Sequence, residues 1–64
     1  MTAEERELLL EARDLAAGIS DKLSLLRIAQ MAGDEESARR LREEAGELYR
    51  KLEPLKEKLM GVKL

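Results

Sequence analysis

Apolar residues recur every three or four positions along nearly all of the 64-residue chain, which is the spacing of one face of an α-helix. The composition agrees, because Leu, Ala, Glu, Arg and Lys dominate it, as in long helices and coiled coils. We therefore predict an all-α protein that forms a single helical domain over residues 1–64. The first apolar stripe comprises Leu8, Ala12, Leu15, Ile19, Leu23 and Leu26. The second comprises Ala38, Leu41, Ala45, Leu48, Leu52, Leu55 and Leu59.

Helix start and stop signals separate the two stripes. Thr2 and Glu5 have the spacing of a capping box, in which each side chain bonds the backbone amide of the other residue. Gly33 suits the left-handed residue that ends a helix, and Asp34 suits the N-cap of the next helix. Gly61 is placed to end the second helix. We expect two long amphipathic helices that fold back at Gly33 as an antiparallel hairpin.

The segment Gly18 to Ser20 offers a competing turn, because glycine can end a helix and serine can cap the next. A break there predicts a three-helix bundle with helices at about 3–17, 20–32 and 35–60. However, the first stripe crosses this segment without a change of phase, and Gly18 falls off the stripe, which favours one helix to about Met31. Pro54 also lies off its stripe, and we expect it to bend the second helix near Arg50.

The hairpin predicts a specific register between the two stripes. Opposite charges would then meet across the helices, with Glu11 near Lys56 and Glu4 near Lys63. The predicted apolar layers include Leu26 with Leu41, Leu23 with Ala45, and Ile19 with Leu48.

The first helix carries more apolar residues than the inner face of a hairpin uses. Leu25, Ile28, Ala29 and Ala32 form a second stripe, and a contiguous exposed patch usually marks an interface. Two helices alone also bury little apolar surface. We expect a symmetric dimer that completes a four-helix bundle, with another protein as the alternative partner of the same face. The predicted interface residues are Leu9, Leu10, Leu25, Ile28, Ala29, Met31, Ala32 and Tyr49.

Catalytic chemistry finds no support in the sequence. Histidine and cysteine are both absent, which removes the commonest general base and the usual zinc and redox ligands. Adjacent carboxylates such as Glu35 and Glu36 point to different faces of a helix. No phosphate loop or dinucleotide fingerprint is present. We expect a chain that is not an enzyme and holds no cofactor or metal ion.

Charge and hydropathy also bear on partners and location. The net charge is −2 with both signs interspersed, and the basic cluster of Arg39, Arg40 and Arg42 is balanced by acidic neighbours. We therefore expect a solvated charged surface and no nucleic-acid site. The longest apolar runs, such as Leu8 to Leu10, are too short to cross a bilayer. The start of the chain lacks the basic and then apolar order of a signal peptide, so we expect a cytoplasmic, or recombinant soluble, protein.

Several short matches carry a family resemblance. The Met1-Thr2 start, Ala12-Arg13 and the run from Glu47 to Arg50, in a hairpin of this length, resemble Rop, a family of small plasmid regulators. The resemblance spans the chain without gaps, and it implies a helical hairpin that dimerises into a four-helix bundle and binds paired RNA loops. The RNA-contacting face of that family uses Lys, Asn, Phe, Gln and Lys. The matching positions here hold Ala3, Leu10, Asp14, Gly18 and Leu25, so the resemblance concerns the architecture alone.

The leading functional hypothesis is a non-catalytic helical module for interaction or assembly. Regular caps and charge pairs favour a de novo designed scaffold or protein binder. Gly18, Gly46 and Pro54 argue for a natural origin, because designers avoid helix breakers in helix interiors. The alternative hypothesis is a small natural Rop-like regulator that binds RNA.

Overall fold

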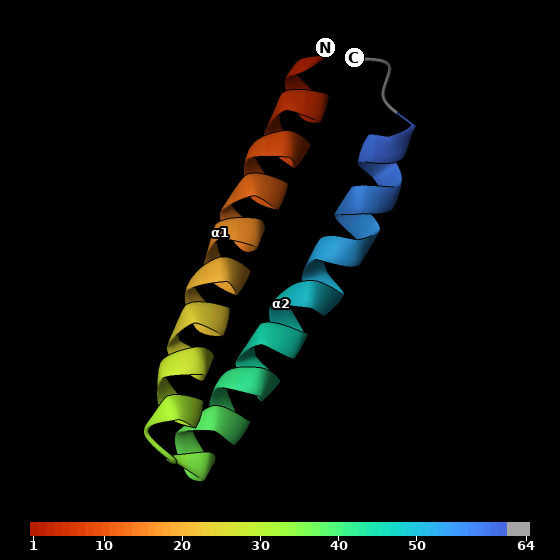
Figure 1. Ribbon diagram of the computed structural model, residues 1–64. Helices are drawn as coiled ribbons and strands as arrows, with labels where there is room; N and C mark the ends of the chain where they lie inside the picture. Colours follow the sequence, from red (N-terminus) through yellow and green to blue (C-terminus); the bar gives the residue numbers. More distant parts are fainter. Residues whose placement is uncertain (62–64) are drawn as a thin grey trace.

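The computed structural model describes residues 1–61 and contains two helices, α1 (Ala3–Met31) and α2 (Glu35–Met60). They lie side by side in opposite directions, joined by a tight turn, as Figure 1 shows. The predicted all-α hairpin is therefore confirmed. The alternative three-helix bundle is wrong, because α1 continues through Gly18 and Ser20 without a break.

Local side-chain chemistry sets the ends of both helices. The amide of Glu5 donates to Thr2 Oγ1 at 3.1 Å and the amide of Thr2 donates to Glu5 Oε1 at 2.8 Å, so the predicted capping box is formed. At the turn, Gly33 adopts a φ of 73°, a conformation that glycine reaches without a steric penalty. Asp34 then caps α2 by accepting a hydrogen bond from the amide of Ser37 at 3.1 Å. Gly61 is the C-cap of α2, as expected.

The inner face of α1 differs from the predicted stripe at one position. Leu23 is 42% exposed, and the half-buried Lys22 occupies the inner face in its place. Two helices that wind around each other keep an alternating spacing of three and four residues along their contact. The series with that spacing is Leu8, Ala12, Leu15, Ile19, Lys22, Leu26 and Ala29, and all seven residues are buried or half-buried.

The buried core is narrow and rich in alanine. Near the turn, Leu26 packs against the cluster formed by Ala29, Ala38 and Leu41, which confirms the predicted layer of Leu26 with Leu41. Ala29 therefore belongs to this core and not to the outer stripe on which the sequence pattern placed it, because the alternating spacing extends through it. The remaining members of the buried core are Ala12, Ile19, Ala45 and Leu55.

Gly18 marks a close approach between the helices. A Cβ atom at this position would lie 3.3 Å from Cδ1 of Leu48 in α2, and the residue is half-buried. The expectation that Gly18 falls off the inner face is therefore wrong. Its place one turn before Lys22, on the flank of the inner face, brings it against α2, and the missing side chain makes room for Leu48.

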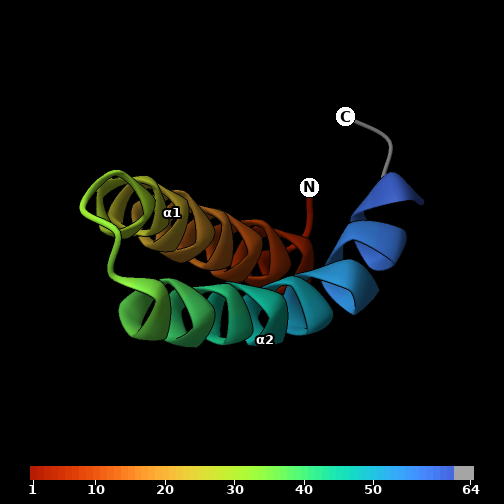
Figure 2. The same cartoon turned by 60° about the horizontal axis from the view of Figure 1, so that its bottom comes forward.

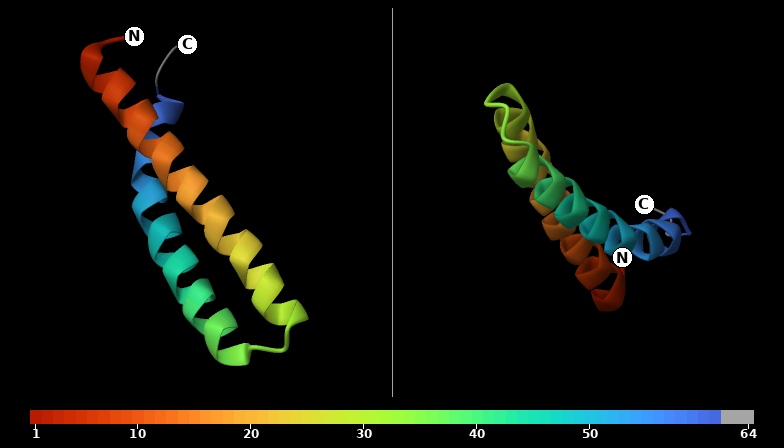
Figure 3. Two further views of the ribbon diagram at one scale, coloured as in Figure 1. Left: turned by 90° about the vertical axis from the view of Figure 1, so that its left-hand side faces the viewer. Right: turned by 90° about the horizontal axis from the view of Figure 1, so that it is seen from below.

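Towards the chain termini the two helices spread apart. α2 continues through Pro54 as one helix, as predicted, and Figure 2 shows it curving in its C-terminal part. Figure 1 shows the helices close together at the turn and farther apart at the opposite end, and the right-hand view of Figure 3 shows them diverging there. Leu8 and Leu59 near that end are accordingly only half-buried. The hairpin thus leaves much of its apolar surface uncovered.

Candidate association surface

Helix α1 exposes large apolar side chains that α2 does not cover. Between 42% and 81% of the surface of each of these residues is accessible. In α2 the exposed large apolar residues are Tyr49 and Met60, while the other large apolar residues of this helix follow a single inner stripe. A helix that is apolar on several faces normally packs against more than one neighbour. The exposed residues within α1 are Leu9, Leu10, Leu23, Leu25, Ile28 and Met31.

Part of this surface forms a continuous patch close to the turn. Ile28 lies one helical turn from each of its neighbours Leu25, Met31 and Ala32, so the four side chains adjoin. Leu25 is 50% exposed and Ile28 is 62% exposed. Ala32 is exposed as well and serves as the C-cap of α1. We call these four residues the outer patch. All of them were predicted as interface residues, and no other residue within 1–61 covers them.

A second apolar area lies along one side of the hairpin, where both helices contribute. It is a groove of about 500 Å³, which we call the lateral groove. Leu23 lines it from α1 and the half-exposed Tyr49 lines it from α2. Leu9 and Ala16 extend the row of Leu23 at intervals of seven residues. The sequence pattern missed Leu23, because it fits the inner stripe equally well. The lining residues are Ala16, Ile19, Ser20, Leu23, Ser24, Arg27, Tyr49 and Leu52.

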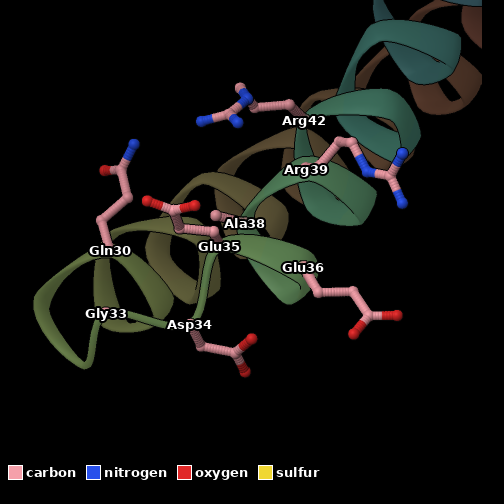
Figure 4. A pocket seen from close by; sticks show the side chains of 8 residues that line it. All are labelled: Gln30, Gly33, Asp34, Glu35, Glu36, Ala38, Arg39 and Arg42. Carbon is pink, nitrogen blue, oxygen red and sulfur yellow. The ribbon is translucent and has the colours of Figure 1, made fainter.

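A third concavity lies at the turn and is lined mainly by polar side chains, with a volume of about 670 Å³. Figure 4 shows that the guanidinium groups of Arg39 and Arg42, two of the lining residues, point away from each other. Ser37 lowers the pKa of Asp34, because its side chain and then its backbone amide bond the carboxylate. Arginines that diverge in this way do not form an anion-binding site.

One ion pair joins the two helices within residues 1–61. Lys22 Nζ lies 2.7 Å from Glu44 Oε2, and this hydrogen bond lowers the pKa of Glu44. The predicted contact between Glu11 and Lys56 is absent from the described part of the chain, because Lys56 pairs with Glu53 in its own helix at 3.6 Å. The predicted partner of Glu4, Lys63, lies outside the described residues.

Other kinds of site find no basis in the described part of the chain. Residues 1–61 hold no group of three side chains that could bind a metal ion. Neither described helix has an apolar stretch of the length needed to cross a membrane. Comparisons of the chain with protein-family models, with curated proteins and with solved structures found no match.

Proposed function

We propose that this protein is a non-catalytic association module, and that its partner is a second copy of itself. The observation that carries the proposal is the outer patch, where Leu25, Ile28 and Met31 each leave half or more of their surface in contact with water. Such contiguous apolar surface on a small protein is typical of interfaces.

The composition of the core supports the same proposal. Within residues 1–61, four of the seven buried residues are alanines, and no large side chain is completely buried. A large apolar side chain contributes roughly 1.5–3 kcal/mol when fully buried, and the exposed residues of α1 forgo much of that contribution. A small domain without disulfide bonds or metal ions commonly gains the missing stability through oligomerisation.

A second copy is the partner that these observations favour over another protein. It is always present at the concentration of the chain itself, and assembly of two hairpins supplies the second helical layer that a two-helix fold lacks. The resemblance to Rop-type hairpins points to the same kind of assembly. The matching RNA-contacting positions differ in residue type, so the proposal does not include RNA binding.

Truncation of the outer patch tests the proposal. Leu25 and Ile28 expose half or more of their surface, so burial in an interface is expected to return about 1 kcal/mol for each of them. The double variant Leu25→Ala and Ile28→Ala should then weaken each interface by about 2 kcal/mol, or roughly 30-fold in the dissociation constant. Alanine keeps the helix propensity high, which separates loss of association from loss of the helix.

Sedimentation equilibrium over a wide concentration range measures the effect. The matched control is Met60→Ala, which removes an even more exposed apolar side chain at the far end of α2 and should leave the mass unchanged. A chain that sediments as a monomer at every concentration, with unchanged helix content, would refute self-assembly. The outer patch would then be a surface for a different protein.

A further inference from the structure

The charged residues of α1 are sorted onto two different sides of the helix. Residues seven apart share one row in a pair of helices that wind around each other. The basic row comprises Arg6, Arg13 and Arg27, with Ser20 between the last two. The acidic row comprises Glu7, Asp14 and Asp21, and Ile28 continues it. The two rows lie about 100° apart around α1, because each residue of the acidic row directly follows one of the basic row. The row of Leu10, Ala17, Ser24 and Met31 runs between them along the back of the helix.

The basic row lies on the side of the lateral groove. Arg27 and Ser20, both members of this row, line the groove together with Leu23 and Tyr49. In α2, the row of Tyr49 at intervals of seven residues also contains Glu35, Arg42 and Lys56. Lys56 is partly neutralised by Glu53. The groove is thus an apolar trough whose rims are mainly basic.

The acidic row borders the outer patch. Ile28 belongs to both, and Leu25 lies in the neighbouring row, which begins with Glu4 and Glu11. The result is one continuous face of α1 that is acidic in its N-terminal part and apolar near the turn. We call it the acidic face.

We infer that the lateral groove of one copy receives the acidic face of α1 from the next copy. The inference deepens the proposed self-association and depends on it. Both surfaces expose apolar side chains, and their charges are opposite, so their contact would be complementary in both respects. A two-fold symmetric interface would instead set each patch against itself and bring like charges together. The inferred arrangement therefore differs from the symmetric dimer expected from the sequence.

The spacing of the charges favours a parallel arrangement of neighbouring copies. Both rows repeat every seven residues, a rise of about 10.5 Å, so Glu7 and Asp14 of one copy match Arg6 and Arg13 of the next when the copies run in the same direction. In that register Asp21 comes level with Ser20, and Ile28 comes level with Arg27, where the groove ends near the turn. An antiparallel arrangement that paired the same charges would place Ile28 beyond the N-terminal end of α1.

One competing contact lies within α1 itself. Arg13 NH2 and Asp14 Oδ1 are 3.5 Å apart, and both side chains are more than 70% exposed. Exposed pairs of this kind contribute little and exchange partners readily. The two side chains therefore remain free to bind neighbouring copies on opposite sides. An assembly in which unlike faces meet does not stop at two copies, unless rotation between them closes a ring.

Two charge-reversed variants test this inference when they are mixed. The groove variant carries Arg13→Glu and Arg27→Glu, and the acidic-face variant carries Asp14→Arg and Asp21→Arg. Each variant alone should lose assembly, since one of its two surfaces repels the other. Their equimolar mixture should assemble again, because the intact groove of one variant matches the intact acidic face of the other, and the two reversed surfaces are opposite in charge as well. The mixture should also regain any helix content that the separate variants lose, which keeps the test valid if they unfold in part.

Analytical ultracentrifugation with circular dichroism distinguishes the outcomes. Assembly of the groove variant on its own, or failure of the mixture to assemble, would overturn this inference and leave the proposed self-association standing. A monomeric unmodified protein would refute the proposed function, and this inference with it. The mixed assembly should weaken as salt is added, because the charged contacts between the two faces are exposed ion pairs.

Discussion

Gly18 and Gly46 lie inside the helices, and replacing each with alanine adds one methyl group that tests how closely α1 and α2 approach each other. Alanine is favoured over glycine in a helix by about 1 kcal/mol. A Cβ at Gly46 would meet nothing within 4 Å among the described residues, so Gly46→Ala should add about 1 kcal/mol to the free energy of unfolding. A Cβ at Gly18 would lie 3.3 Å from Leu48 Cδ1, which must shift by a few tenths of an ångström.

The expected effect of Gly18→Ala is therefore smaller. Leu48 is half-buried and its terminal methyl group can move, so the shift should remove part of the gain and leave a net stabilisation of about 0.5 kcal/mol. Urea unfolding followed by circular dichroism, at one protein concentration for all variants, measures the difference. Gly33→Ala is the control of opposite sign, because its φ of 73° is strained for alanine and should cost about 1 kcal/mol. Equal stabilisation by Gly18→Ala and Gly46→Ala would refute the close approach at Gly18.

Acid should destabilise the hairpin, because the fold lowers the pKa of Asp34 and of Glu44 through hydrogen bonds from Ser37 and Lys22. The stability that these two carboxylates contribute is complete above their unfolded-state pKa values and is lost as the pH falls through the lower folded-state values. The melting temperature should therefore drop in acid. It should drop less in a variant with Asp34→Asn and Glu44→Gln. Pro54→Ala should restore a backbone hydrogen bond in α2 and raise the free energy of unfolding by up to about 3 kcal/mol in urea titrations. A loss of assembly in that variant, by sedimentation, would instead show that the bend in α2 serves the interface.

The ends of the helices, and with them the hairpin, could be predicted from the sequence because they depend on contacts only a few residues apart. Thr2 and Glu5 form their capping box within one turn, and Gly33 and Asp34 reverse the chain with contacts of similar range. The layer of Leu26 with Leu41 followed from these ends, since a hairpin with a short turn has little freedom to slide. The excess of apolar residues in α1 could also be predicted from the sequence, because these residues can be counted without knowing how α2 packs against α1.

The tertiary structure decided which side of the apolar stripe faces the neighbouring helix. Helical periodicity alone leaves the centre of a stripe uncertain by about one residue, so Lys22 and Leu23 were equally acceptable on the inner face. Only the approach of α2 places Lys22 beside Glu44, Gly18 against Leu48 and Leu23 in the lateral groove. The same approach assigns the basic row of α1 to the groove side. Charges that look interspersed along the sequence thus become sorted in space, because the direction of a side chain depends on the contact of two helices and not on its own helix alone.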